Sequence, residues 1–212
     1  ANFTGTASQI YAAFYGGYEG ELTGNVTITD TSGTIAATIL SGIGSETSGT
    51  VTITNSSGIT VTGSAAEITA ALVTASSLVV ASSVDVTIDD DAGTAISAAE
   101  LSAIGAKTTG TVTVTNAVAI SGTAAQVTAA LVTTDTLVEV SDAAVTISDG
   151  DATALDATAL SAIGAKTTGT VTVTNAVVIS GTADQVTAAL VTDGSKVEVS
   201  DAAVTISDNP TI

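Results

Sequence analysis

The sequence predicts an α/β repeat protein, a β-rich solenoid of short strand-arc-strand rungs with short capped helices. Three observations predict it: tandem self-similarity, alternating Val/Thr runs, and Ser/Thr capping boxes ahead of Ala-rich segments. Hydrophobic residues make up 45% of the chain and aromatic residues 2%, with the apolar weight in Ala, Val and Ile. Small and β-branched side chains suit thin stacked layers better than a thick globular interior. A two-domain β-rich fold with incidental helices is the alternative.

The repeat is visible along most of the chain. The segment LSAIGAKTTGTVTVTNAVAISGTAAQVTAALVT starts at Leu101 and returns almost unchanged from Leu160, and a more divergent copy starts at Leu40. In the second repeat, half-unit A begins at Thr111 and half-unit B at Leu137. We therefore divide the chain into an N-terminal divergent partial repeat (1–48), two repeats (49–109 and 110–168) and a C-terminal partial repeat (169–212).

Alternating Val and Thr residues predict the strands. In Thr111–Thr115 the Val side chains point to one face and the Thr side chains to the other, with the period of two of a half-buried strand. Asn116, which tolerates a sharp backbone corner, is followed by a second run over Val118–Ser121. Half-unit B has Asp142 and Val145–Ser148 in the same order. Two strands joined by a corner predict an arc, one rung of a solenoid.

Capping boxes predict a short helix in every half-unit A, because a Ser or Thr and a Glu or Gln three residues later bond to each other's backbone amides. The pairs are Thr6/Gln9, Ser64/Glu67, Thr123/Gln126 and Thr182/Gln185, with Ser97/Glu100 in half-unit B. Behind the box, apolar residues fall at helical spacing, as in Ala65, Ile68 and Leu72. A glycine expected to end the B helix in the left-handed conformation stands at Gly44, Gly105 and Gly164.

The spacing of neighbouring elements adds a further expectation. Strands pair about 4.8 Å apart, whereas packed helices need roughly 8–10 Å. Either the stack curves with its helices on the convex side, or A and B helices alternate between the two faces. The alternating half-units favour the second arrangement.

The missing residue types exclude most chemistry, and we expect the chain not to be an enzyme. It has no His and no Cys, so it lacks an imidazole base and a thiolate nucleophile. Its basic residues are Lys107, Lys166 and Lys196, against 21 acidic residues and a net charge of −18. Nucleic-acid binding needs clustered cations and is therefore excluded. No apolar run approaches the roughly 20 residues of a membrane span, so no membrane insertion is expected.

The same composition predicts an extracellular or cell-surface protein. Near-absence of Lys and Arg leaves trypsin-like proteases few sites, and strong acidity suits exposure outside the cell. No charged segment followed by an apolar segment opens the chain, so we expect any secretion signal to have been removed or to lie elsewhere. A soluble acidic domain of another compartment is the alternative.

Acidic residues recur at the second turn of half-unit B, at Asp30, Asp90, Asp149 and Asp208. Neighbouring carboxylates make a set of candidate metal ligands: Asp89, Asp90, Asp91, Asp149, Asp151 and Asp156. Clustered carboxylates suit Ca²⁺, which takes roughly 6–8 oxygen ligands. Neither loop has the EF-hand spacing or the Gly-rich nonapeptide of calcium β-rolls. A turn or helix-cap role is therefore favoured, with Ca²⁺ as the alternative and no other cofactor expected.

The aromatic residues gather near the N-terminus, at Phe3, Tyr11, Phe14, Tyr15 and Tyr18. Later repeats hold mostly Val, Leu or Thr at the aligned positions. Open strand edges at the ends of a stack invite pairing with another copy. The cluster therefore predicts either a self-assembly surface of a head-to-tail homopolymer or the small core of a divergent terminal repeat.

Rows of threonine residues indicate ice binding as a further candidate function. They are Thr50, Thr52 and Thr54; Thr111, Thr113 and Thr115; and Thr170, Thr172 and Thr174. Half-unit B places Leu137, Glu139 and Ser141 at the equivalent outward positions. We therefore expect the threonine ranks to be interrupted on every other rung, which weighs against an ice-matching lattice.

The repeat LSAIGAKTTGTVTVTNAVAISGTAAQVTAALV resembles the Thr/Ala/Val/Asp-rich tandem repeats of giant secreted bacterial cell-surface proteins, in the style of those of marine cyanobacteria. The likeness covers nearly the whole chain and implies a role in surface layers, adhesion or extracellular fibres, with no catalytic residues. The sequence thus predicts a structural protein of an extracellular filament, fibre or surface layer that assembles by end-to-end stacking. A rigid spacer of a giant adhesin is the alternative, and an ice-binding solenoid the second alternative.

Overall fold

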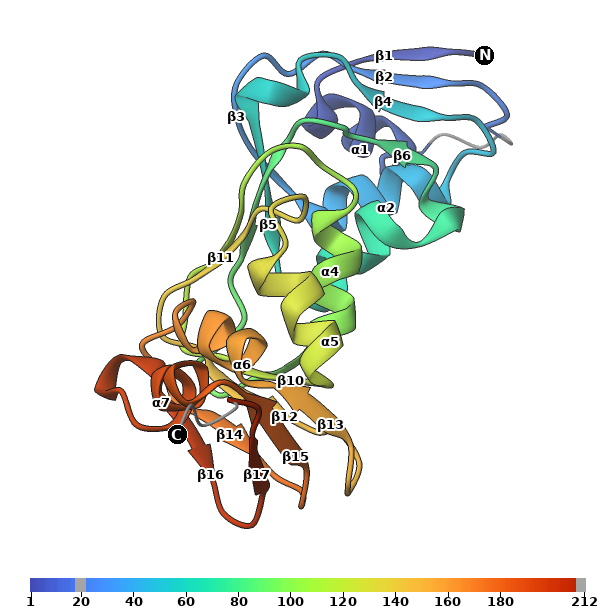
Figure 1. Ribbon diagram of the computed structural model, residues 1–212. Helices are drawn as coiled ribbons and strands as arrows, with labels where there is room; N and C mark the ends of the chain where they lie inside the picture. Colours follow the sequence, from blue (N-terminus) through green and yellow to red (C-terminus); the bar gives the residue numbers. More distant parts are fainter. Residues whose placement is uncertain (18–21, 209–212) are drawn as a thin grey trace. The chain divides into compact units, whose positions relative to one another are not determined.

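A computed structural model describes residues 1–17 and 22–208, which form two compact units of short strands and helices (Figure 1). The first unit holds Ala1–Asp90, Ala103–Val114 and Asp135–Val138; the second holds Asp91–Ser102, Thr115–Thr134 and Glu139–Ile212. The described residues form seven α-helices, and their strands pair in parallel. The predicted mixed α/β class is therefore confirmed.

The first unit contains two parallel sheets. One has the order β1-β2-β4-β6 and the other the order β3-β5-β7-β9-β11. Their strands are β1 (Phe3–Gly5), β2 (Val26–Ile28), β3 (Gly33–Ala36), β4 (Val51–Ile53), β5 (Ile59–Gly63), β6 (Val79–Val80), β7 (Asp85–Ile88), β9 (Val112–Val114) and β11 (Val138–Val140). The helices are α1 (Ala7–Tyr15), α2 (Ala37–Ser45) and α3 (Ala65–Ile68), which continues as the π-helical segment η2 (Thr69–Val73).

The second unit contains the other two parallel sheets, with the orders β8-β10-β12-β14-β16 and β13-β15-β17. Their strands are β8 (Ala95–Ser97), β10 (Ala119–Gly122), β12 (Ala144–Ile147), β13 (Ala154–Asp156), β14 (Val171–Val173), β15 (Val178–Gly181), β16 (Val197–Val199) and β17 (Ala203–Ile206). The helices are α5 (Ala124–Val127), its π-helical continuation η4 (Thr128–Val132), α6 (Ala157–Gly164) and α7 (Ala183–Leu190). Helix α4 (Ala98–Gly105) contributes residues to both units.

The alternating Val/Thr runs form strands with the predicted facing. In β12, Val145 and Ile147 are buried and Thr146 between them is half-buried. Val145 pairs with Val171 and Thr146 with Thr172 of β14, so like side chains stack across the ladder. Half-unit B carries an additional strand immediately before its helix, seen in β3, β8 and β13, which the sequence analysis did not predict. This strand is short and lacks Val/Thr alternation, so its period gives no signal.

The capping boxes of half-unit A are confirmed. In α5, the Thr123 hydroxyl accepts from the Gln126 amide, and the Gln126 side chain accepts from the Thr123 amide. The same reciprocal pair opens α1, α3 and α7. In half-unit B, the Ser97 hydroxyl accepts from the Glu100 amide at 3.1 Å. These caps satisfy amides that the first helical turn leaves without partners.

The prediction for the glycines at the end of the B helices is wrong. Gly44, Gly105 and Gly164 lie inside or at the last residue of their helices, and none is among the described glycines with positive φ. A Cβ on Gly164 would lie 1.7 Å from the carbonyl oxygen of Ser195, and one on Gly44 would lie 2.0 Å from that of Ser77. Glycine is required there because the turn after the next A helix contacts the helix backbone directly.

The expected alternation of A and B helices between two faces is also wrong. In the first unit α1 packs against α2, and in the second unit α6 packs against both η4 and α7. Consecutive A and B helices are thus direct neighbours, as Figure 1 shows for α6 and α7. The buried side chains Leu40, Leu101 and Leu160 of the B helices, each 0% exposed, lie in this helix layer.

Candidate functional site

The recurring aspartates of half-unit B are helix caps. Asp149 Oδ2 accepts a hydrogen bond from the amide of Ala124, the first residue of α5, at 2.6 Å. The same bond recurs in the pairs Asp30/Ala7 (2.7 Å), Asp90/Ala65 (2.6 Å) and Asp208/Ala183 (2.8 Å). A helix N-terminus carries free amides and a partial positive charge, which a carboxylate stabilises. Each aspartate therefore links its half-unit to the preceding one, in the helix-cap role that the sequence favours.

The other candidate metal ligands are also engaged with the backbone. Asp151 Oδ1 accepts from the amide of Ala176 at 3.1 Å, and Asp156 Oδ1 accepts from the amide two residues later at 2.6 Å, capping α6. For Asp89 and Asp91 it is the main chain that bonds: the amide of Asp89 donates to the carbonyl of Gly63, and the carbonyl of Asp91 accepts from the amide of Thr94. Within residues 1–17 and 22–208, no three carboxylates are arranged to hold a metal ion. Calcium binding stays a prediction.

The aromatic residues of the N-terminal segment form two separate pairs. Phe3 and Phe14 meet edge to face with ring centroids 5.1 Å apart, and Phe14 is buried. The rings of Tyr11 and Tyr15 lie 4.5 Å apart, and Tyr15 is 53% exposed. Phe3 and Phe14 thus form a small core between β1 and α1. Tyr18 lies outside the described residues, and a self-assembly role for the five aromatics stays a prediction.

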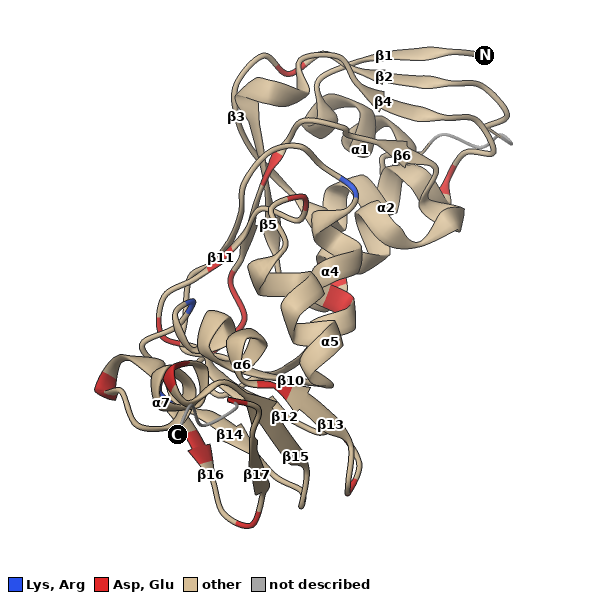
Figure 2. Ribbon diagram, in the orientation of Figure 1, with Lys and Arg blue, Asp and Glu red and all other residues tan. Residues whose placement is uncertain are grey.

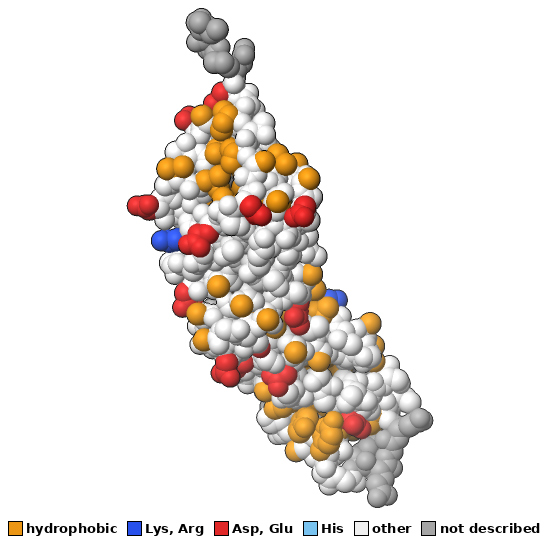
Figure 3. Space-filling model, turned by 90° about the horizontal axis from the view of Figure 1, so that it is seen from below, with side chains coloured by type: hydrophobic (Ala, Val, Ile, Leu, Met, Phe, Trp, Pro, Cys, Tyr) orange, Lys and Arg blue, Asp and Glu red, His pale blue; other side chains and the backbone are white. Residues whose placement is uncertain are grey.

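Each of the four sheets ends in two edge strands with one described neighbour, and β1 and β17 are two of these eight. β1 pairs only with β2, and β17 pairs only with β15. Neither strand contains a charged residue. On β17 the side chains of Val204 and Ile206 are 46% and 48% exposed. In Figure 3, apolar side chains gather in several separate groups on one face, with acidic side chains between them.

Hydroxyl side chains form continuous ranks on the outward face of the sheets. Thr4, Thr27 and Thr52 are paired across β1, β2 and β4. The sheets of five strands carry the ranks Thr62, Thr87, Thr113 and Ser121, Thr146, Thr172. The predicted interruption is found at the first strand of half-unit B, where Val80 pairs with Thr52 and Glu198 with Thr172. The threonine that the middle strand of half-unit B adds on the other side of each A strand was not predicted.

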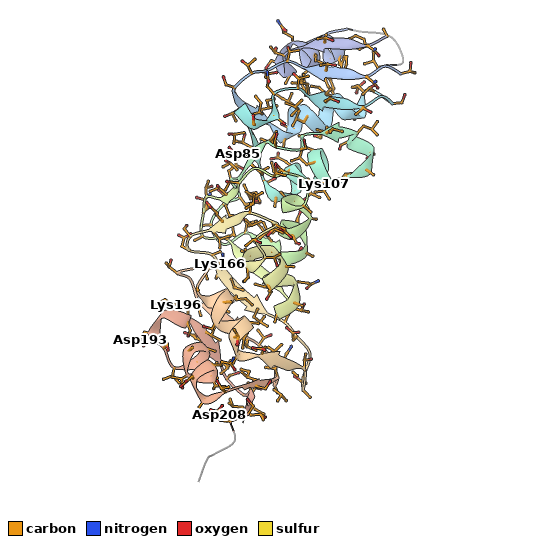
Figure 4. The ribbon with its side chains drawn as sticks, turned by 45° about the horizontal axis from the view of Figure 1, so that its top comes forward. Asp85, Lys107, Lys166, Asp193, Lys196 and Asp208 are labelled. Atoms are coloured by element: carbon orange, nitrogen blue, oxygen red, sulfur yellow. The ribbon has the colours of Figure 1, made fainter. Side chains whose placement is uncertain are left out.

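Charged side chains are scattered over the described surface. Acidic residues lie in loops, in helices such as α3 and α4 and on strands such as β16, and they form no single patch (Figure 2). The three lysines, Lys107, Lys166 and Lys196, lie in separate loops (Figure 4). Across the part of the chain that the structure describes, no helix has the length and hydrophobicity needed to cross a membrane.

A hollow of 450 Å³ in the second unit has two carboxylates in its lining. Its lining includes Thr128, Ala129, Asp149, Leu155 and Asp156. Both carboxylates already accept hydrogen bonds from helix amides, and the remaining lining is small and mostly apolar. The hollow therefore offers no pair of free catalytic carboxylates.

In comparisons with known proteins, no family model matches the chain, and no curated protein and no solved structure matches it.

The exposure of the side chains on β17 is the feature of this region that the sequence pattern predicts least clearly. The run AVTI occurs twice, at Ala144–Ile147 and at Ala203–Ile206, and period alone predicts one inward face for both. Exposure differs because the two strands have different numbers of neighbours. Aligning the repeats strand by strand would have indicated that the two AVTI runs have different numbers of neighbouring strands.

Proposed function

We propose that this chain is a structural repeat protein of an extracellular filament, fibre or surface layer, which assembles by end-to-end stacking of its rungs. The observation that carries the proposal is the set of sheet edges formed by short strands without charged residues, as at β3, β6 and β8. Backbone amides and carbonyls along such an edge can pair with a strand of another chain. A joint between two different surfaces of one molecule continues from copy to copy when its rotation does not close a ring.

The ladder register supports a solenoid as the architecture of the rungs. In the second unit, Val145 lies opposite Ile120 on one side and Val171 on the other. In the first unit, Val86 lies in the same way between Val61 and Val112. Because the same residue types recur opposite each other, a further rung of this sequence would find an equivalent partner.

The satisfaction of buried polar groups supports a structural rather than a catalytic role. Thr47 Oγ1 donates to the carbonyl of Gly24 at 2.7 Å, and Thr167 Oγ1 donates to that of Ala143 at 2.6 Å. Among the described residues, no buried side-chain nitrogen or oxygen lacks a hydrogen-bond partner. These buried hydroxyls join consecutive half-units, and none is left for a ligand.

Strong acidity supports a location outside the cell. The net charge of −18 keeps separate molecules soluble through mutual repulsion. Edge pairing would then concentrate contact at the uncharged strands, while the acidic loops keep other surfaces apart. The three lysines leave few positions for trypsin-like proteases.

Electron microscopy and sedimentation of the purified protein, with and without a calcium chelator, test the proposal. We expect filaments or sheets of regular repeat that persist in chelator, because the aspartate turns are occupied by helix amides. Loss of the assemblies in chelator would assign the aspartates to metal binding. Monomers at every concentration would contradict self-assembly and favour a rigid spacer of a giant adhesin.

The hydroxyl ranks favour ice binding as a second candidate function. Thr4, Thr27 and Thr52 stand on three neighbouring strands, so their hydroxyls repeat at about the 4.8 Å strand spacing. Thermal hysteresis and ice-crystal shaping by the purified protein test this candidate. Loss of both on Thr27→Val, with unchanged circular dichroism, would support it; wild-type protein without hysteresis would exclude it.

A further inference from the structure

The polar corner that follows the first strand of half-unit A differs between the repeats. From the corner asparagine to the glycine before the helix cap, the chain runs over 55–63 in the first repeat and over 175–181 in the C-terminal partial repeat. The corner of the first repeat is therefore two residues longer, and it contains the 3₁₀ turn η1 (Ser56–Gly58). Exposed turns of this kind are where a fold tolerates added bulk.

The two neighbouring half-units hold this turn in place. The hydroxyl of Ser56 is hydrogen-bonded to that of Ser83 in the following half-unit. A Cβ on Gly58 would lie 2.6 Å from the carbonyl oxygen of Thr31, so the turn also contacts the preceding half-unit closely. The residues on either side of Ser56 are both exposed. The turn is thus fixed to the fold while these two residues face solvent.

The side chain of Asn55 has no structural role that the structure shows. Its main-chain carbonyl accepts from the amide of Gly58 at 3.1 Å, but within the described residues its side chain makes no hydrogen bond. The equivalent Asn175 is half-buried, and its Nδ2 donates to the carbonyl of Asp149 at 2.6 Å. The amide group that joins two half-units at Asn175 is therefore free at Asn55.

The exposed corner also carries a modification motif. Its residues Asn55, Ser56 and Ser57 read Asn-x-Ser, and x is not proline. This is the acceptor motif for N-linked sugars in the surface loops of secreted proteins. The corner at Asn175 continues with Ala and Val and lacks the motif. We infer that Nδ2 of Asn55 is the attachment site of an N-linked glycan, an inference that rests on the extracellular location in the proposed function.

The attachment is the transfer of a sugar from an activated donor. The donor class is a sugar joined through C1 to a lipid-linked diphosphate, at the membrane that a secreted chain crosses. A bond forms between Nδ2 and C1 while the bond between C1 and the diphosphate oxygen breaks. The diphosphate leaves with the electron pair of that bond, and Nδ2 gives up one proton. The chain supplies the exposed amide and the hydroxyl two residues later.

Two other asparagines carry the same motif, and the structure distinguishes them from Asn55. They are Asn2 and Asn25, which lie immediately before β1 and β2. Asn2 Oδ1 accepts from the amide of Asn25 at 3.0 Å, and Asn25 Oδ1 accepts from the amide of Thr50 at 3.1 Å. The residue after Asn25, Val26, is 0% exposed. Both side chains therefore already join neighbouring strands, whereas that of Asn55 does not.

Mass spectrometry of the protein from its natural source tests the site. Cleavage after glutamate places Asn55 on the peptide 47–67, apart from Asn2, Asn25 and Asn175. We expect this peptide to carry the mass of one or more sugar residues and the peptide with Asn175 to carry none. An amidase that cleaves the N-linkage should remove the added mass and leave an aspartate at position 55. Fractionation of the same material shows whether the protein lies outside the cell.

A matched pair of substitutions tests the dependence on the motif. Ser57→Ala removes the hydroxyl and should abolish the sugar on Asn55, whereas Ser57→Thr keeps a hydroxyl and should keep the sugar. Ser57 is exposed, so both variants should fold, and circular dichroism of each checks this. Both variants are secreted from the same host as the wild type.

The outcomes separate this site from the proposed location. Extracellular protein with a sugar on Asn55 that is lost in Ser57→Ala and kept in Ser57→Thr supports the inference. Extracellular protein without a sugar on Asn55, or with one only on Asn2 or Asn25, would overturn the site and leave the proposed function intact. Protein that is found only inside the cell and carries no sugar would overturn both.

Discussion

Two helical segments of the second unit have almost the same sequence and different helical geometry. Ala124–Val132 reads AAQVTAALV and Ala183–Val191 reads ADQVTAALV. The first is α-helical for one turn and then π-helical as η4, whereas the second is α-helical as far as Leu190. Both begin with the same capping box and the same aspartate cap. Local sequence therefore determines how the helix starts, and something else determines how it continues.

Packing is the difference between the two segments. α6 packs against η4 as the next α-helix along the chain, while within the described residues α7 is followed by the 3₁₀ helix η5 (Asp193–Ser195) and by no α-helix. Leu131 is 2% exposed and its counterpart Leu190 is half-buried; Val191 is 71% exposed. In α7 the Thr187 carbonyl accepts from the amides of both Val191 and Thr192 at 3.0 Å. We interpret the π-helical turn as the geometry that a covering helix imposes, since an isolated π-turn is rare.

Removal of a buried side chain from the covering helix α6 should have the largest effect on stability. Leu160 of α6 is 0% exposed, and Leu160→Ala should lower the free energy of unfolding by about 2–5 kcal/mol through the cavity it leaves. Urea unfolding measures this loss. Hydrogen exchange should also show the amides of Leu131 and Val132 losing protection toward the level of Leu190 and Val191.

Thr158→Ala, at an exposed position of the same helix, is the control and should change stability by less than about 0.5 kcal/mol. Unchanged protection of Leu131 in the Leu160→Ala variant would contradict the role of packing in η4.

A side chain at Gly164, which contacts the turn after α7, should have the second largest effect on stability. Gly164→Ala would place a methyl group 1.7 Å from the Ser195 carbonyl, a backbone atom that cannot rotate away. The overpacking should cost about 1–3 kcal/mol, measured by thermal or urea unfolding. Gly150→Ala, where the nearest atom to the added Cβ is 3.9 Å away, is the matched control. Equal stability of the two variants would show that the turn at Ser195 moves to accommodate the methyl group without cost.

The aspartate caps allow the starts of α5 and α7 to be compared by mutation. Asp149→Ala should cost about 1–2 kcal/mol and Asp208→Ala about 0.5–1 kcal/mol, because the bond of Asp149 is part-buried and that of Asp208 is exposed. Chemical unfolding of the two variants measures both values. Calcium that raises the melting temperature of the wild type and of neither variant would instead assign the aspartates to metal binding.

The smallest effect concerns a turn in half-unit B. Ala152 has φ 60°, and the equivalent turn of the preceding repeat has Gly93 with φ 82°. Ala152→Gly should raise stability by about 1 kcal/mol, since an L side chain is disfavoured in the left-handed region by roughly 1–2 kcal/mol. Gly93→Ala should lower the free energy of unfolding by a similar amount. No atom lies within 4 Å of the added Cβ, so this effect comes from the backbone conformation alone. Effects of the same sign in both variants would contradict this conformational explanation.

Much of the local structure was predictable. The Val/Thr period identified β9, β12 and β14, and the capping boxes identified the start of every A helix. The third strand of half-unit B was not predictable, because its three residues, as in Ala154–Asp156, carry no periodic signal. The role of Gly164 was also missed, since a close approach of distant backbone leaves no trace in the helix sequence.

The candidate sites likewise combine features that the local sequence predicts with features that depend on distant segments. A carboxylate at each B turn was evident from the sequence, and a helix cap was the favoured role. Its partner, the first amide of the helix in the preceding half-unit, depends on how neighbouring half-units pack. The exposure of Val204 and Ile206 depends on the number of neighbouring strands, which identical AVTI runs cannot encode.

By itself, the sequence determined the mixed α/β class, the repeat, the strand facing and the helix starts, because these depend on residues a few positions apart. Only the tertiary structure decided the strand orders, the π-helical turns and the glycine contacts. Each of these depends on which distant segment lies alongside. The parallel ladders join residues 23 to 28 positions apart, and their hydrogen bonds are backbone bonds that any sequence of the right period can make.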